Sequence, residues 1–285
     1  MLQILVNALI SAAMLAPPAI AFTLLFSILR FPNFAVGSYI TVGSYAALVA
    51  NMAGAPMAVA VPVAMAVTAI LFWLADVAVF RPLQGHADVT LLVVSIALSF
   101  IVESAVRLAF GSSVRGYDIP LARPHEWAGV RITSDQVAML LGAAAILLAA
   151  HIVLRYVPAG KAIRAVADNP ALAEARGIDT QRINRLVWLF GGALVGFSGV
   201  VAGMELVIEP AVGAKLIIPV FAAAIVGGIG SPTGAVAGAL LVSVAEEVAL
   251  LVLPSAYKPA VGFVLIAVTL VVRPHGLMGR PSIRK

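Results

Sequence analysis

Charged residues and cysteines are scarce in this sequence of 285 residues. Charged side chains make up 11% of the chain and hydrophobic residues 62%, whereas an ordinary soluble domain is about 25% charged. This composition excludes a soluble enzyme, a disordered chain and a nucleic-acid-binding domain. The absence of cysteine excludes disulfides and thiolate metal sites. The net charge of +5 therefore indicates basic loops near anionic lipid headgroups, not a nucleic-acid partner.

Long apolar runs, separated by charged or Pro/Gly-rich breaks, divide the chain into about nine segments. Lipid offers no partner for a free backbone N–H or C=O, and the runs lack the two-residue alternation of a barrel strand. The sequence therefore predicts an all-α fold, a polytopic transmembrane helical bundle of eight to ten spans in one domain over residues 1–285. The segments lie at 4–29, 34–50, 57–80, 89–110, 136–156, 181–208, 215–229, 233–253 and 258–272.

The distribution of Lys and Arg among the loops predicts the orientation, because cytoplasmic loops carry more of both. Of the 18 basic residues, twelve fall in one set of alternate loops, five in the other set and Arg107 within a span. This bias places the loop 157–180 and the C-terminus in the cytoplasm. It places the N-terminus and the loop 111–135 outside.

The loop 157–180 contains the signals of a short, stiff helix. Asn169 can cap its first turn, Pro170 suits the first helical position, and Gly177 suits a left-handed terminator. Asp179 or Thr180 can then cap the span that follows. Such a helix, held parallel to the membrane, is suited to act as a lever.

Small residues indicate close helix packing in the second half of the chain. Spacings of four between glycines let a neighbouring helix approach the backbone closely, and five glycines with a proline over 227–238 indicate a break between two spans. No P-loop pattern occurs, which excludes ATP hydrolysis of that type by this chain. The predicted packing and break residues are Gly192, Gly196, Gly227, Gly228, Gly230, Gly234 and Gly238.

Polar side chains inside apolar spans are candidates for function. Glu103 and Arg107 are four residues apart, which predicts an ion pair within one helix, whereas Glu246 and Glu247 fall in the middle of a predicted span. Hydroxyls have an alternative role, since they can bond to carbonyls of their own helix. The candidate solute-path residues are Asn33, Ser38, Thr41, Ser95, Ser99 and Glu246.

Three motifs in a fixed order carry a family resemblance. They are Asn33-Phe34-Ala35-Val36-Gly37, the stretch from Gly160 to Ile178, and the stretch from Pro210 through the glycine-rich break to the Arg273-Pro-His-Gly-Leu-Met-Gly-Arg-Pro segment. In this order they resemble the permease subunits of branched-chain amino acid ABC importers, a group that includes urea and amide permeases. The family usually has histidine at the position of Val36, which leaves the solute class open.

The resemblance implies the membrane subunit of an ATP-driven importer in the bacterial inner membrane, moving a small polar solute such as a branched-chain or other amino acid. It implies no cofactor in this chain, because separate ATPase subunits would use the ATP. The other implied partners are a second, similar permease subunit, forming a heterodimer, and a periplasmic solute-binding protein. The implied ATPase-coupling residues are Arg164, Asp168, Asn169, Pro170, Glu174, Arg176 and Gly177.

Two other function classes compete with this interpretation. A self-sufficient secondary transporter or channel would show an inverted repeat with broken helices in both halves, and the glycine-rich stretches of the two halves are only weakly similar. A membrane-embedded enzyme would need reactive groups that converge at one depth. The four histidines, His86, His125, His151 and His275, are scattered near segment ends, and no metal site is predicted.

Overall fold

A computed structural model describes residues 2–279, except residue 84 and residues 120–124 and 128–129. The described residues are mostly helical, and two short strands form a hairpin, in which β1 (His125–Trp127) pairs antiparallel with β2 (Val130–Ile132). The helices are α1 (Leu2–Leu29), α2 (Ala35–Met52), α3 (Met57–Ala75), η1 (Asp76–Phe80), η2 (Arg81–Leu83), α4 (Asp88–Phe110), α5 (Ser134–Tyr156), α6 (Pro158–Asp168), α7 (Pro170–Ala175), α8 (Thr180–Glu205), α9 (Val212–Gly227), α10 (Pro232–Ala249), η3 (Ser255–Tyr257) and α11 (Lys258–Val272).

Six of the described helices are long and apolar enough to cross a membrane. They are α1, α3 with the two short helical turns that extend it, α4, α5, α8 and α10. The predicted polytopic helical bundle is thereby confirmed. The count of nine spans stays a prediction, because α9 and α11 are apolar but shorter, and α2 is not among the six.

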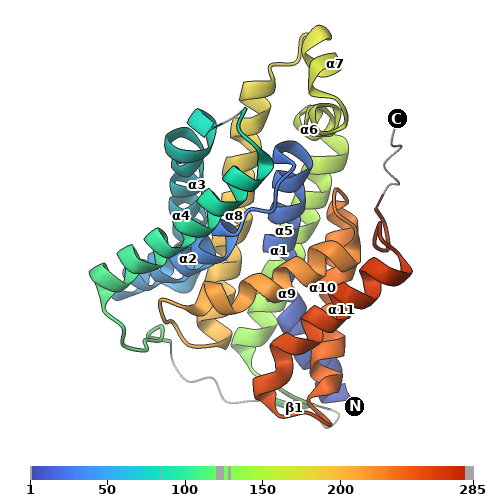
Figure 1. Ribbon diagram of the computed structural model, residues 1–285. Coiled ribbons are helices and arrows are strands. Elements are labelled where there is room, and N and C mark those ends of the chain that lie inside the picture. Colours follow the sequence, from blue (N-terminus) through green and yellow to red (C-terminus); the bar gives the residue numbers. More distant parts are fainter. Residues whose placement is uncertain (1, 84, 120–124, 128–129, 280–285) are drawn as a thin grey trace.

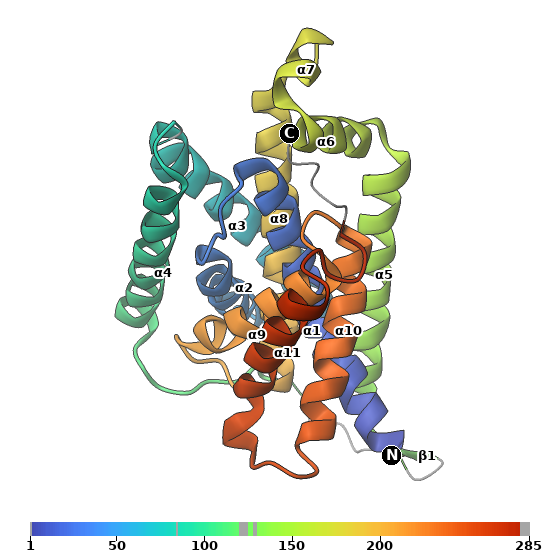
Figure 2. The same cartoon turned by 45° about the vertical axis from the view of Figure 1, so that its right-hand side comes forward.

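The bundle has two distinct ends (Figure 1). At one end lie α6, α7 and the turn between α9 and α10, which we call the α6 end. At the other end, called the hairpin end, the first turn of α1 meets the strands: the Arg131 amide donates to Gln3 Oε1 at 2.9 Å, and Gln3 Nε2 donates to the Arg131 carbonyl. Figure 2 shows these two ends, with α6 and α7 at one and the N-terminus and β1 at the other, from a second side.

The core surrounds α1 and α8. Both helices are buried over most of their length, as expected for helices that are apolar on all sides. They contact each other directly, since the Ser198 hydroxyl of α8 donates to the Met14 carbonyl of α1 at 2.7 Å. Gly192 and Gly196 bring α8 against the backbone of α3; a Cβ at Gly196 would lie 2.8 Å from the Ala64 carbonyl oxygen.

Two sets of four helices, α1–α4 and α8–α11, pack in the same order and run in opposite directions. Each set starts with a long helix, of 28 and 26 residues, and continues with a short one, of 18 and 16 residues. The long first helix of each set packs on the third helix of the other set: α1 packs on α10, and α8 packs on α3. Within each set the second helix packs on the fourth: α2 packs on α4, and α9 packs on α11. This is the arrangement of an inverted repeat, with α5, α6 and α7 as the connection.

The glycine-rich break lies between α9 and α10. The two helices meet backbone to backbone: a Cβ on Gly227 would lie 2.0 Å from the Gly234 carbonyl oxygen, and one on Gly238 would lie 2.0 Å from the Ala223 carbonyl oxygen. Gly228 and Gly230 have φ of 107° and 89°, a region that favours glycine. The turn is covered by residues 273–279, because the Leu277 amide donates to the Val226 carbonyl at 2.9 Å.

Candidate coupling element and solute path

A pair of short helices, α6 and α7, forms the outermost part of the α6 end (Figure 2). Asn169 lies between them, and its Oδ1 accepts a hydrogen bond from the Leu172 amide at 3.0 Å. Pro170 occupies the first turn of α7, and Gly177 leaves the helix with φ of 82°. Asp179 Oδ1 then accepts from the Arg182 amide at the start of α8. Local side chains thus define where α7 begins and where α8 begins.

Helix α6 was not expected as a separate element, yet it anchors this pair to the bundle. It buries Ile163 and Val166 on one face, an amphipathic pattern within 157–168 that a search for helical periodicity would have found. Gly160 lets α6 lie against the last turn of α5, since a Cβ there would come within 2.3 Å of the Val153 carbonyl oxygen. The Arg164 Nη1 also donates to the Leu154 carbonyl. These contacts attach α6 to α5.

The predicted coupling residues are all exposed: Arg164, Asp168, Asn169, Pro170, Glu174, Arg176 and Gly177. Arg164 also bonds to the Leu154 carbonyl of α5, and together with Asp168 it lines a cavity below α6. Glu174 also accepts a hydrogen bond from the Thr180 hydroxyl at 2.6 Å, which links α7 to the first turn of α8.

The short helices α2 and α9 cross near their N-terminal ends. Gly37 and Gly213 make the crossing possible, because a Cβ on Gly213 would lie 1.8 Å from the Gly37 carbonyl oxygen. Thr41 sits at the same point: its Oγ1 accepts from the Gly213 amide at 3.0 Å and donates to the Pro210 carbonyl at 3.3 Å. A side chain of α2 thereby caps the N-terminus of α9.

Two other candidate path residues serve the N-terminus of α2. The Ser95 hydroxyl of α4 accepts from the Phe34 amide at 3.1 Å, and Asn33 Oδ1 accepts from the Ala35 amide at 3.0 Å. Ser38 and Ser99 donate to carbonyls of their own helices. The structure therefore brings Asn33, Thr41 and Ser95 to the ends of the two short helices, and Ser99 lies farther along α4.

Glu246 lies in the last turn of α10, which ends at Ala249, so its predicted position in the middle of a span was wrong. The sequence interpretation extended this helix to 253 because the residues after Ala249 are also apolar. Lys258 at the start of α11 faces both carboxylates: its Nζ is 2.7 Å from Glu247 Oε1 and 4.0 Å from Glu246 Oε2. The Glu246 and Glu247 side chains are buried.

The first part of the loop 111–135, which was predicted to be external, is docked on the bundle, whereas residues 120–124 and 128–129 lie outside the described residues. Arg115 exchanges backbone hydrogen bonds with Ile208, which follows α8. The Tyr117 hydroxyl donates to the Ser44 carbonyl of α2 at 3.1 Å, and burial raises the pKa of this hydroxyl. Sequence reasoning missed Tyr117, since a lone tyrosine in a polar loop carries no local signal.

Comparison with protein families agrees with this architecture. Residues 4–272 match the family described as the permease component of the branched-chain amino acid transport system. The chain belongs to this family.

Curated relatives of this permease share its full length. It is 32% identical to the high-affinity branched-chain amino acid transport system permease protein BraD of Pseudomonas aeruginosa, over 100% of this chain and 97% of the relative. It is 29% identical to the LivH permease protein of Escherichia coli, with the same coverage. It is also 29% identical to the probable LivH permease of Methanocaldococcus jannaschii, over 97% of this chain and 92% of the relative.

Solved structures show a similar fold. PsaBC from Streptococcus pneumoniae in complex with Fab matches with a TM-score of 0.50 and 17% identity, over 94% of this permease and 91% of that chain. A metal-chelate type ABC transporter in an inward-facing conformation matches with a TM-score of 0.51 and 18% identity, over 95% of this permease and 88% of that chain.

Val36, where the family usually has histidine, is fully buried in α2, one residue before the Gly37 crossing.

Proposed function

We propose that this permease is a single membrane domain over residues 1–285 that carries branched-chain or other small amino acids through the bacterial inner membrane, powered by ATPase subunits. The family match over residues 4–272 is the observation that carries this proposal. The inverted arrangement of α1–α4 and α8–α11 does not favour a self-sufficient transporter, because chains of ABC transporters have a similar fold.

The α6 end is proposed to face the cytoplasm. Basic residues gather there on α5 and α6, directly after α7 and at the start of α8, in keeping with the excess of Lys and Arg in cytoplasmic segments. Four residues used in the charge count, Arg123, Arg280, Arg284 and Lys285, lie outside the described residues. In this orientation the N-terminus is outside and the C-terminus is cytoplasmic, with nine apolar segments entering the bilayer and α2 and α9 reaching only part of its depth.

The proposed partners follow from the same role. Cytoplasmic ATP-binding subunits, a second homologous permease subunit and a periplasmic solute-binding protein would complete the importer, and no cofactor would be bound by this chain. Helix α7 would contact the ATPase, since it exposes Leu172 at 56% of its surface together with Glu174 and Arg176. An exposed leucine at the tip of a helix is suited to insert into a groove of a partner.

Movement would pass from the ATPase into the bundle as a rigid-body displacement. The attachment of α6 to α5 and the bond between Glu174 and Thr180 join the helix pair to two long helices. Helix α8 packs on α1, α2 and α3, so a shift at α7 reaches the centre of the bundle. The crossing of α2 and α9, with Asn33, Ser38, Thr41 and Ser95, is the proposed position of the solute path, and Glu246 would act at its outer end.

The experiment is co-purification of the ATPase subunits with wild-type permease and two variants. Leu172→Glu alters the tip of α7, whereas Leu206→Glu is the matched control, because Leu206 is an exposed leucine after α8 at the hairpin end. We expect wild type and Leu206→Glu to bring down the ATPase and to support ATP-dependent amino-acid uptake in vesicles. Leu172→Glu should lose both.

Three results would contradict the proposal. The ATPase could remain bound to Leu172→Glu, or be lost equally from both variants. Purified permease alone could move solute across the vesicle membrane without ATP, which would favour the secondary transporter.

A further inference from the structure

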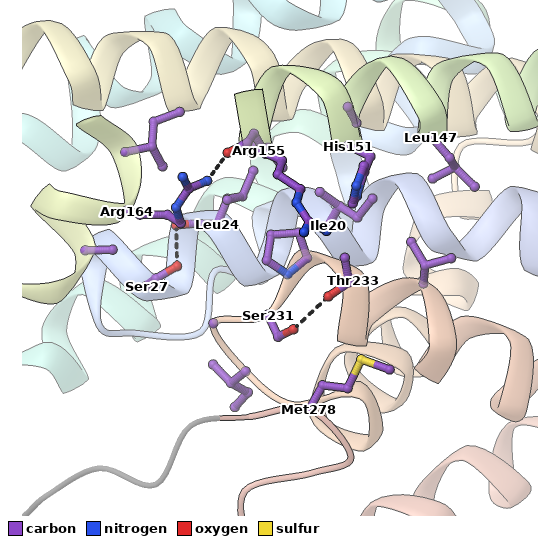
Figure 3. Close-up of a pocket in the computed structure, with 18 of the residues that line it drawn as sticks. Ile20, Leu24, Ser27, Leu147, His151, Arg155, Arg164, Ser231, Thr233 and Met278 are labelled. Atoms are coloured by element: carbon purple, nitrogen blue, oxygen red, sulfur yellow. Dashed lines mark hydrogen bonds between the residues drawn. The ribbon is translucent and has the colours of Figure 1, made fainter. Parts of the chain in front are cut away.

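A cavity of about 470 Å³ lies at the α6 end between α1, α5, α6 and the start of α10 (Figure 3). It is separate from the crossing of α2 and α9, and the transport mechanism proposed above assigns it no role. One wall is polar and basic, with His151, Arg155 and Arg164. An adjoining wall is apolar. A cavity with this division favours an amphipathic ligand.

Three basic side chains line this cavity. His151 and Arg155 lie one turn apart on α5 and point toward the segment that holds Ser231 and Thr233 (Figure 3). Arg164 comes from α6, and its bond to the Leu154 carbonyl holds its guanidinium at the rim. Asp168 is the acidic residue of the lining. Two guanidinium groups against one carboxylate leave the rim positively charged.

The N-terminal end of α10 adds to this positive charge. Ser231 caps the helix by accepting from the Gly234 amide at 3.1 Å, and the lining continues through Pro232 and Thr233 in the first turn. The helix dipole places partial positive charge at this end, and helix N-termini bind phosphate for this reason. The guanidiniums and the helix terminus therefore act on the same volume, and both favour an anion.

The apolar wall extends away from this rim toward the centre of the bundle. Ile20 and Leu24 of α1 and Leu147 of α5 form it. Leu147 lies nine residues before the end of α5, which corresponds to about 13 Å along the helix axis. The outer face of α5 exposes Leu148 and Ile152, so the helix that carries the basic residues also faces lipid. A free phosphate ion would leave the apolar wall unused.

We propose that this cavity binds an anionic phospholipid, with the phosphate held by Arg155, Arg164, His151 and the start of α10 and an acyl chain along Ile20, Leu24 and Leu147. Basic pockets between transmembrane helices bind lipid headgroups by the same chemistry. The bound lipid joins α5 and α6 to α10, and so stabilises the junction below the coupling helices. This proposal concerns a structural ligand and is independent of the transported solute.

The test measures ligand binding to the delipidated, full-length permease by native mass spectrometry. The probes are phosphatidylglycerol, phosphatidylcholine and inorganic phosphate. Arg155→Gln removes a phosphate contact, and Thr233→Asp places a carboxylate at the rim. Aspartate is favourable in the first turn of a helix, so Thr233→Asp should fold. Lys161→Gln is the matched control, because Lys161 is exposed on α6 outside the cavity.

We expect phosphatidylglycerol to bind wild type and Lys161→Gln equally, and to bind Arg155→Gln and Thr233→Asp about tenfold more weakly, since a charge-assisted hydrogen bond contributes this order of affinity. Phosphatidylcholine should bind weakly to all four proteins. The proposal is overturned if Lys161→Gln loses as much as the two cavity variants, or if both lipids bind alike. Binding of inorganic phosphate without binding of lipid would replace the lipid with a free anion and overturn the assignment.

Discussion

The turn after α2 and the turn after α9 hold equivalent positions in the two inverted halves, and their surroundings differ. Gly54 in the first turn has φ of 85° and open space around it, and this turn lies near the hairpin end. Gly228 in the second turn has φ of 107° and is packed against Gly276 and Gly279 of the C-terminal segment. The second turn is therefore a tertiary junction near α6, whereas the first is a simple connection.

The N-termini of the two short helices differ in a related way. The first amides of α2 are satisfied by Asn33, just before it, and by Ser95 of its own half. The Gly213 amide of α9 is satisfied by Thr41, which belongs to the other half. The N-terminus of α9 therefore needs a side chain from the first half, and the turn after α9 needs the C-terminal segment to pack against it. Four comparisons between substituted proteins test how the two halves differ.

The largest effect is expected from Gly213→Ala, which acts where the two halves cross. Its Cβ would meet the Gly37 carbonyl oxygen at 1.8 Å, and a rigid backbone cannot yield as a side chain does. We expect a loss of about 3 kcal/mol, measured as a lower thermal midpoint of the purified protein. Gly262→Ala is the control, because its Cβ would make an ordinary contact of 3.6 Å. Equal midpoints for the two variants would show that the crossing can relax.

Gly228→Ala compared with Gly54→Ala tests the difference between the two turns directly. Both substitutions impose left-handed strain of about 1 kcal/mol, but only the Cβ at 228 also meets the Gly279 amide nitrogen, at 2.3 Å. We expect Gly228→Ala to cost about 2 kcal/mol in total. It should also speed hydrogen exchange at the Leu277 and Met278 amides. If exchange at both amides stays slow in Gly228→Ala, the packing of the C-terminal segment does not depend on Gly228.

The ion pairs of the two halves offer a third comparison. Lys258→Met leaves Glu246 and Glu247 buried without their cation, whereas Arg107→Met breaks an exposed pair within α4, in which Arg107 lies 2.7 Å from Glu103. We expect Lys258→Met to lower the free energy of unfolding by about 2 kcal/mol and Arg107→Met to lower it by less than about 1 kcal/mol, both measured by thermal unfolding. Lys258→Arg should recover most of the stability. If both methionine variants lose the same amount, burial is not what distinguishes the pairs.

The smallest difference is expected between the two helix caps. Thr41→Val keeps the shape of the side chain and leaves the buried Gly213 amide without its acceptor, for a loss of about 1.5 kcal/mol. Ser95→Ala affects the partly buried Phe34 amide and should cost about 1 kcal/mol. Ser99→Ala, which removes only a bond within α4, should stay within about 0.5 kcal/mol in the same unfolding assay. A larger loss for Ser99→Ala than for Thr41→Val would exclude the capping role.

Much of the architecture could be predicted from local signals. The helical bundle follows from apolar runs, and the start of α7 follows from Asn169 and Pro170, because both act within a few residues of their own position. The extent of α10 could not be predicted in the same way. Apolar residues continue to 253, and the helix ends at Ala249. Hydropathy reports where a chain can be buried, not where its hydrogen-bond ladder stops.

The candidate path residues show the same limit. Asn33, Thr41 and Ser95 could be recognised as polar groups within apolar spans, since each one departs from its own neighbours. That Thr41 meets the Gly213 amide, 172 positions away, depends on the crossing of two helices from different halves. Likewise, His151, Arg155 and Arg164 line one cavity because α6 turns back over α5 and places Arg164 near the start of α10.

The sequence by itself determined that this permease is a helical membrane protein, which family it belongs to, and where the short helix α7 begins. The first and the last depend on composition or on neighbours a few residues apart, and the family depends on the order of motifs along the chain. Only the tertiary structure decided which polar groups are capping partners, that Glu246 lies beside Lys258, and that the two halves are inverted copies in packing. Those outcomes depend on backbones approaching across the bundle, where glycine allows contact and a donor at a helix N-terminus can find its acceptor on another helix.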